Sequence, residues 1–254
     1  MASNRNKQSS PNNQFHRVSC IRSGLRSLMK SIEKIDPLLL FRHRCVVFDF
    51  DGTLCDSAGD ILATLYEVVR LHGIDPDGLN PARIGPPLPL MIRQVVGEQI
   101  DQAVIDSMVV EYRQIYEKSD FPASPLYPGA TDLLRQLKSA GIRLAVATNK
   151  KERSTHHILE KKGLLSFFDE VLSSDRNEEK WDKERMLRYI LDVTHTKPDE
   201  CGFIGDTGGD VLAGKKVAVT TIGALYGYGT AKEVLESGPD YCCERLTDLL
   251  PAKR

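Results

Sequence analysis

The chain has 254 residues, of which 41% are hydrophobic and 27% charged, with a formal net charge of -1. This length allows one large domain or a core with a smaller domain, and the near-neutral charge argues against binding to nucleic acid or to an anionic membrane. No stretch approaches the ~20 apolar residues of a membrane-spanning helix, so we expect a soluble globular protein.

Residues 1–43 predict a basic N-terminal tail followed by an amphipathic helix. No acidic residue precedes Glu33, whereas six cations do: Arg5, Lys7, Arg17, Arg22, Arg26 and Lys30. Apolar residues recur there at helical spacing, namely Val18, Ile21, Leu25, Leu28, Ile32 and Ile35. A helix that packs on the domain or on a second subunit fits this pattern, and so does an organelle transit peptide.

The cysteines bear on the compartment. The chain has six of them, without CxxC or zinc-site spacing, and two lie inside predicted core strands, so we expect reduced thiols. Reduced thiols indicate an intracellular protein. We therefore expect a cytoplasmic location, or a mitochondrion or plastid if the N-terminal segment is a transit peptide.

From Arg44 onward, short apolar runs alternate with amphipathic stretches. The pattern predicts strands at 45–48, 143–148, 170–173, 201–205 and 220–223 and near Tyr241, with helices at 130–140, 151–162, 183–192 and 209–216. Such alternation is typical of an α/β fold with a Rossmann-like parallel sheet core. We expect residues 44–58 and 126–254 to form this core, with ligands beyond the carboxyl ends of the strands.

The first strand ends in a pair of carboxylates. Asp49 and Asp51 point the same way while the chain stays extended, and Gly52 can then turn the backbone beside the free hydroxyl of Thr53. Two such acids repel by about 4 kcal/mol at ~4 Å if the effective dielectric constant is about 20. They need a cation, a shared proton, or both, which indicates a phosphoryl-transfer site.

The segment 59–125 interrupts the alternation. Its pattern is helical at 61–71, 88–96 and 99–116, without a clear strand, and prolines mark its return at 122–128. This predicts an inserted all-α cap domain joined to the core by two connections. Such a lid can exclude water and contribute substrate contacts.

Polar groups also follow two later strands. Thr148, Asn149 and Lys150 offer a hydroxyl, an amide and an amine suited to phosphoryl oxygens, although such residues often only cap a helix. Asp206 and Asp210 lie four residues apart in a glycine-rich stretch, one turn of a helix that would begin there. Hard oxygen ligands of this kind suit Mg²⁺.

A phosphate that faces several carboxylates needs a fixed positive charge. Lys183 is the first residue of a predicted helix with a clear apolar stripe. Because such a helix would start at the end of a strand, the amine of Lys183 would lie near the site. Lys180 is the alternative.

These four motifs, DFDGT at 49–53, ATNK at 147–150, the lysine at 183 and GDTGGD at 205–210, occur in the order found in haloacid dehalogenase superfamily hydrolases. The chain resembles the phosphoglycolate-phosphatase-like group with a small helical cap, from Arg44 to Leu250. Residues 183–189 and 223–229 also resemble a broad-specificity 5′-nucleotidase-like branch.

The resemblance implies roles for these residues. Asp49 would be the nucleophile, and Asp51 the acid that protonates the leaving oxygen and the base that activates water. Thr148 and Lys183 would bind phosphoryl oxygens. The implied Mg²⁺ ligands are Asp49, the backbone carbonyl of Asp51, Asp206 and Asp210, and the implied substrate contacts are Gly52, Thr53, Thr148, Asn149 and, from the cap, Arg83.

The expected function is a Mg²⁺-dependent phosphatase of small soluble phosphomonoesters that works through an aspartyl-phosphate. The partner would be 2-phosphoglycolate or another small phosphorylated metabolite, and the protein a monomer or homodimer. A nucleoside 5′-monophosphate phosphatase and a phosphomutase are alternatives on the same scaffold. A phosphorylation-controlled receiver-like domain and a silent binding protein are the alternatives outside enzymes. In the cap, Arg93 or Arg113 could take the place of Arg83.

Overall fold

The computed structural model describes residues 33–76, 84–121, 123–176 and 180–251. Within these residues, parallel strands form one sheet in the order β1-β7-β6-β5-β2-β3-β4. The strands are β1 (Glu33–Lys34), β2 (Cys45–Phe48), β3 (Arg143–Thr148), β4 (Glu170–Ser173), β5 (Cys201–Gly205), β6 (Thr220–Ala224) and β7 (Tyr241–Cys243). The chain runs outward in opposite directions from β2, so the end of this strand is the switch point where ligands bind in such folds. The predicted α/β Rossmann-like sheet is confirmed.

The N-terminal part of the described chain differs from the prediction. Glu33–Lys34 pairs in parallel with β7, and Ile35, which follows this strand, is buried. Ile35 therefore does not lie on the predicted amphipathic helix. A two-residue strand is too short to show an alternating pattern, and its pairing with β7 is a tertiary contact that periodicity does not contain. Residues 1–32 of the predicted tail and helix lie outside the described residues.

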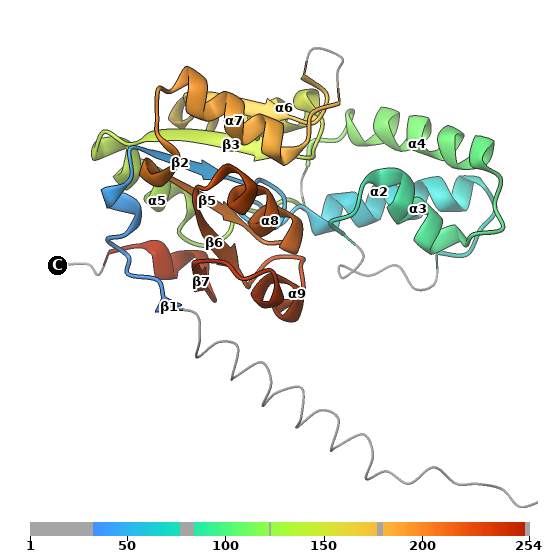
Figure 1. Cartoon of the computed structure of the whole chain (residues 1–254). Coiled ribbons are helices and arrows are strands. Elements are labelled where there is room, and N and C mark those ends of the chain that lie inside the picture. The colour runs from blue at the N-terminus through green and yellow to red at the C-terminus, as the bar shows by residue number, and fades with distance from the viewer. Residues whose placement is uncertain (1–32, 77–83, 122, 177–179, 252–254) are drawn as a thin grey trace, which may run out of the picture.

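Helices cover both faces of the sheet (Figure 1). Val46 and Phe48 belong to one buried cluster with residues of α5 and α6, whereas Cys45 and Val47 belong to a second with residues of α7 and α8. This alternation along β2 is the period-two pattern of a strand buried on both faces. The helices of this part are α5 (Ala130–Ser139), α6 (Glu152–Lys161), α7 (Lys183–Val193), α8 (Gly208–Val217) and the short α9 (Ala231–Glu236), which the sequence pattern did not predict.

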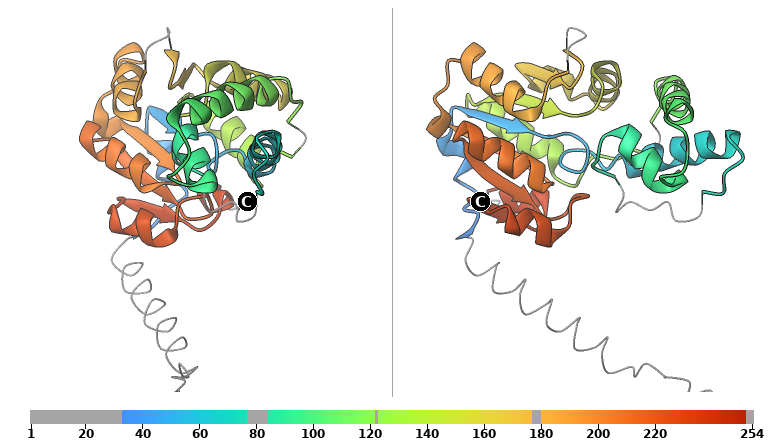
Figure 2. Two further views of the ribbon diagram at one scale, coloured as in Figure 1. Left: turned by 90° about the vertical axis from the view of Figure 1, so that its right-hand side faces the viewer. Right: turned by 45° about the vertical axis from the view of Figure 1, so that its right-hand side comes forward.

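The helices α2 (Ala58–Leu71), α3 (Leu88–Val96) and α4 (Gln102–Tyr116) lie beyond the carboxyl ends of the central strands (Figures 1 and 2). They confirm the helices predicted between 59 and 125; α4 begins at Gln102, later than predicted, because the Asp101 side chain caps it. We call these three helices the cap helices; the boundaries of a separate cap domain stay a prediction.

Among the described residues, every helix of the protein is too short or too polar to cross a membrane.

The two connections to the cap helices are paired with each other. Asp56 N–H donates to Pro125 O at 2.8 Å, and Tyr127 N–H donates to Leu54 O at 3.0 Å, with an antiparallel bridge between Cys55 and Leu126. The two chains thus form a short antiparallel ribbon.

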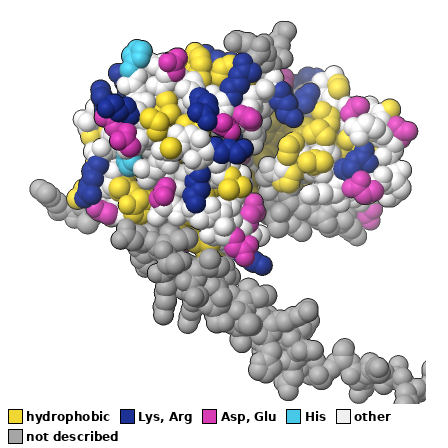
Figure 3. Space-filling view, viewed as in Figure 1, with side chains coloured by type: hydrophobic (Ala, Val, Ile, Leu, Met, Phe, Trp, Pro, Cys, Tyr) yellow, Lys and Arg dark blue, Asp and Glu magenta, His cyan; other side chains and the backbone are white. Residues whose placement is uncertain are grey.

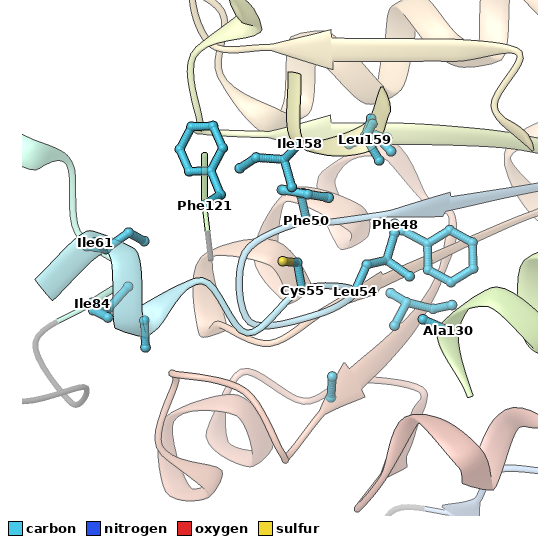
Figure 4. Packing of buried hydrophobic residues seen from close by; sticks show 14 of the residues in the cluster. Phe48, Phe50, Leu54, Cys55, Ile61, Ile84, Phe121, Ala130, Ile158 and Leu159 are labelled. Carbon is cyan, nitrogen blue, oxygen red and sulfur yellow. The ribbon is translucent and has the colours of Figure 1, made fainter. Parts of the chain in front are cut away.

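A buried carboxylate and a continuous hydrophobic cluster hold this region together. Asp60 accepts hydrogen bonds from Ser124 Oγ at 2.5 Å and from Ala123 N–H at 3.2 Å. The hydrophobic cluster of the sheet continues past this point toward the cap helices: Figure 4 shows Phe50 and Cys55 in the turn after β2, with Ile61 farther out on α2. The base of the cap helices is therefore packed against the core.

Candidate active site

The turn after β2 places Asp49 at the centre of the sheet edge. Asp49 N–H still donates to Ile204 O of β5 at 2.8 Å, so this residue is held like a strand residue. Phe50 points the other way and is fully buried, which stabilises the turn by roughly 1.5–3 kcal/mol. Gly52 has φ +82°, and a Cβ there would lie 2.2 Å from Asp206 Oδ2. Only glycine lets this turn pass against Asp206.

Three buried carboxylates meet beside the turn. One oxygen each of Asp49, Asp206 and Asp210 lies within 4.8 Å of the others. Asp206 follows β5 and accepts from Tyr228 N–H at 2.7 Å and from Thr53 Oγ1 at 3.2 Å. Asp210 lies in the first turn of α8 and accepts from Thr207 N–H at 3.0 Å and Thr207 Oγ1 at 2.7 Å. The structure thus brings together the predicted metal-binding side chains, all three of them fixed by hydrogen bonds.

These carboxylates fit a divalent cation. Burial raises the pKa of Asp49 to about 8; Lys183 opposes this rise, and Asp210 and Asp206 add to it. Burial and Asp210 likewise raise the pKa of Asp206 to about 6. The cluster is therefore short of positive charge at neutral pH, and oxygen-only donors are those that Mg²⁺ prefers. The side chain of Asp51 is outside the cluster; only its backbone carbonyl was expected to bind the metal, and that stays a prediction.

Lys183 supplies the cation that the sequence predicted. It is the first residue of α7, and its Nζ lies 2.7 Å from Asp49 Oδ2 and 2.5 Å from Asp210 Oδ1. Burial by itself lowers the pKa of Lys183, but Asp210 and Asp49 outweigh it and raise the pKa above its usual value. Lys180, the alternative, is exposed. The geometry favours Lys183 as the phosphate-binding lysine.

Asp51 faces a different set of partners. Lys150 Nζ donates to its two oxygens at 3.1 and 3.2 Å, and Ser57 Oγ donates to Oδ1 at 2.5 Å. Lys150 Nζ also donates to the hydroxyl of Tyr116, at the end of α4, at 2.6 Å. The sequence showed Lys150 at the end of a strand but gave no sign of its partner, and it gave no sign of Ser57 or Tyr116.

Several of the groups predicted to contact substrate form hydrogen bonds within the protein. Thr148 is buried at the end of β3, and its Oγ1 accepts from Lys150 N–H at 3.1 Å; Asn149 is exposed. Thr53 was expected to offer a free hydroxyl, but this hydroxyl donates to Asp206. Gly52 N–H donates to Cys55 O at 2.9 Å, within the turn.

Of the three cap arginines named as possible substrate contacts, the structure describes Arg93 and Arg113, and Arg113 is exposed. Arg83 lies outside the described residues. Arg93 donates to Ile100 O at 3.2 Å and to Gln102 Oε1 at 2.6 Å, so it ties α3 to the start of α4. Figure 3 instead shows hydrophobic side chains gathered on the cap helices, beside the hollow between them and the rest of the protein.

Comparison with known proteins agrees with this arrangement. The profile of the haloacid dehalogenase-like hydrolases matches residues 46–224. A phosphoglycolate phosphatase of Pseudomonas putida is 30% identical over 230 residues, which are 88% of this chain and 84% of that protein. A phosphoglycolate phosphatase of Vibrio vulnificus is 27% identical over 217 residues, 82% of this chain and 94% of that protein. The crystal structure of a predicted phosphatase from Clostridium acetobutylicum is 30% identical, with a TM-score of 0.72 over 82% of this chain and 96% of that one.

Proposed function

The chain belongs to the haloacid dehalogenase-like hydrolase family and is a phosphatase, and from this premise we propose that it hydrolyses small soluble phosphomonoesters with Mg²⁺ through an aspartyl-phosphate on Asp49. The observation that carries the proposal is the contact between Asp49 and Lys183 inside the cluster with Asp206 and Asp210. This arrangement joins a nucleophile, an amine for phosphoryl oxygens and a set of metal ligands at one strand end.

The reaction takes two displacements. In the first, an oxygen of Asp49 attacks phosphorus while the ester bond breaks, and Asp51 gives its proton to the leaving oxygen. In the second, Asp51 takes a proton from water, the water oxygen attacks phosphorus, and inorganic phosphate and Asp49 are released. Two easier steps replace one of the slowest uncatalysed reactions.

The cluster would hold the metal. Asp49, Asp206, Asp210 and the backbone carbonyl of Asp51 would be its ligands, and a bound Mg²⁺ neutralises charge on the carboxylates and the phosphoryl oxygens. Lys183 and Thr148 would orient the same oxygens, with Lys183 as a fixed charge between Asp49 and Asp210.

Asp51 supports an ester substrate rather than a halide, because a halide leaves without a proton. Ser57 and Lys150 hold the Asp51 carboxylate at the side of the turn that faces the cap helices. 2-Phosphoglycolate is the proposed substrate because the relatives in Pseudomonas putida and Vibrio vulnificus are named phosphoglycolate phosphatases. The cytoplasmic location, and a monomeric or homodimeric state, stay predictions.

A panel of phosphomonoesters tests the proposal. The purified protein is assayed for released phosphate with 2-phosphoglycolate, nucleoside 5′-monophosphates and sugar phosphates, each with Mg²⁺ and with EDTA. We expect release with Mg²⁺, loss of release with EDTA, and 2-phosphoglycolate as the best substrate. A preference for nucleotides would support the nucleotidase alternative, and an isomerised sugar phosphate without free phosphate a mutase. An aspartyl-phosphate that lasts for minutes, without turnover of any ester, would instead support a receiver-like domain.

A further inference from the structure

The loop between β6 and α9 lies against the carboxylate cluster. A Cβ on Gly227 would lie 2.2 Å from Asp206 Cβ, and one on Gly229 would lie 2.2 Å from Asp206 O. The backbone of the loop thus touches Asp206, and Tyr228 N–H donates to Asp206 Oδ2 at 2.7 Å. This loop carries the sequence likeness to the nucleotidase-like branch, for which the proposed function gives no role.

The side chain of Tyr228 reaches the first connection to the cap helices. Its hydroxyl accepts from Ala58 N–H at 2.8 Å, donates to Asp56 Oδ1 at 3.0 Å, and lies 3.4 Å from Ser57 Oγ. Burial raises the pKa of Tyr228, so the hydroxyl keeps its proton and can donate. One residue therefore contacts Asp206 through its backbone and residues 56–58 through its side chain.

These contacts explain an unusual helix start. Ser57 is the N-cap of α2, where a serine hydroxyl commonly accepts an N–H of the first turn. Here Ser57 makes no such bond, and its hydroxyl donates to Asp51 Oδ1. The Tyr228 hydroxyl accepts the first N–H of the helix, that of Ala58. Tyr228 thus satisfies a donor at the helix end, and Ser57 is left to hold Asp51.

We propose that Tyr228 is a positioning residue for the phosphatase reaction: its hydroxyl fixes residues 56–58 so that Ser57 Oγ orients the carboxylate of Asp51. The inference rests on the proposed function, in which Asp51 protonates the leaving oxygen. Its consequence is selective, because loss of the Tyr228 hydroxyl weakens proton transfer to the leaving group and leaves Asp49, Lys183 and the metal ligands in place.

Leaving groups of different basicity test this role. An alkyl phosphate needs a proton on its leaving oxygen, whereas p-nitrophenolate leaves without one. The value of kcat/KM covers the steps up to transfer to Asp49, so the later attack by water does not enter it. For Tyr228→Phe we expect kcat/KM to fall about tenfold with the best alkyl phosphate and less than about twofold with p-nitrophenyl phosphate.

Two further variants sharpen the test. Ser57→Ala should give the same selective loss, and the double variant should lose no more than Ser57→Ala alone, because Tyr228 acts through Ser57. Tyr226→Phe is the matched control: it removes a hydroxyl from the same loop, but that hydroxyl donates to Thr53 O at 2.8 Å. Its ratio of the two kcat/KM values should equal that of the wild type. Thermal unfolding and circular dichroism verify that each variant is folded.

Three outcomes would overturn the inference. Equal losses of kcat/KM on both esters would show that Tyr228 only maintains the structure, and unchanged kcat/KM values on both esters in Tyr228→Phe would show that it does not orient Asp51. Either result leaves the proposed function intact. A wild-type protein that releases phosphate from no ester would remove the proposed function and this inference together.

Discussion

Lys150 Nζ lies 3.1 and 3.2 Å from the two oxygens of Asp51, so an amine from the end of β3 binds the carboxylate that follows β2. Only 6% of the Lys150 side chain is exposed, so solvent screens this ion pair weakly. The same amine donates to Tyr116 of α4. The Lys150 amine, which comes from the core, therefore contacts both the acid Asp51 and the cap helix α4.

The first prediction concerns this cation. Lys150→Met should lower kcat at least tenfold, because Asp51 loses the partner that holds both of its oxygens, and the melting temperature should fall as a partly buried carboxylate is left unpaired. Lys150→Arg should recover part of the activity. Steady-state kinetics and thermal unfolding measure both effects. Normal kcat in Lys150→Met would show that the ion pair does not support catalysis.

The second prediction concerns the nucleophile. Asp49→Asn should reduce phosphate release at least about a thousandfold, because an amide does not form the phosphorylated intermediate. The fold should persist, since Asn has nearly the same shape and Phe50 still anchors the turn. Phosphate release and circular dichroism check the two statements. Near-normal release by this variant would end the proposed mechanism.

The third prediction separates two lysines. Lys183→Met removes the amine between Asp49 and Asp210 and should lower kcat/KM at least a hundredfold, because phosphoryl oxygens lose a fixed charge. Lys180→Met is the matched control, since Lys180 is exposed, and it should stay within about twofold of the wild type. Comparable losses in both variants would contradict the assignment of Lys183.

The fourth prediction concerns pH. The pKa of Asp49 is raised to about 8 and that of Asp206 to about 6, so both hold protons more tightly than free carboxylates do. Mg²⁺ must displace these protons, so its affinity should rise with pH, by about tenfold per pH unit between pH 6 and 8, where one proton is displaced. The increase in melting temperature on addition of Mg²⁺ should therefore be larger at pH 8 than at pH 6. Equal increases in melting temperature at pH 6 and pH 8 would contradict this prediction.

The sequence predicted the parts of the site that follow from a single segment. Asp49, Thr148 and Asp206 each stand directly after an apolar run, and in a parallel sheet such positions meet at one edge. The meeting of Asp49, Asp206 and Asp210 could therefore be predicted without coordinates. Lys183 could be preferred to Lys180 because its helix had a clear apolar stripe and because residues 183–189 resemble the lysine helix of the nucleotidase-like branch.

Contacts between separate segments could not be predicted in this way. Tyr228 reaches Ala58 across 170 positions of the chain, and Lys150 reaches Asp51 across 99. The hydrophobic pattern predicts the helix or strand to which a residue belongs and the face on which its side chain lies. It does not predict which side chain of another element that residue contacts. The hydroxyl of Thr53 shows the same limit, because its acceptor, Asp206, belongs to another strand end.

The ribbon formed by the two connections limits how the cap helices can move. Two hydrogen-bonded chains resist shearing within their own plane but bend easily out of it, and Asp60 fastens them together at the outer end through Ser124. The cap helices would thus rotate about a single hinge axis, because the two connections move together and not independently. Ser57 lies where this ribbon joins α2, and the Tyr228 hydroxyl holds residues 56–58 at that point, so the contact of Ser57 with Asp51 would stay near the axis while the helices turn.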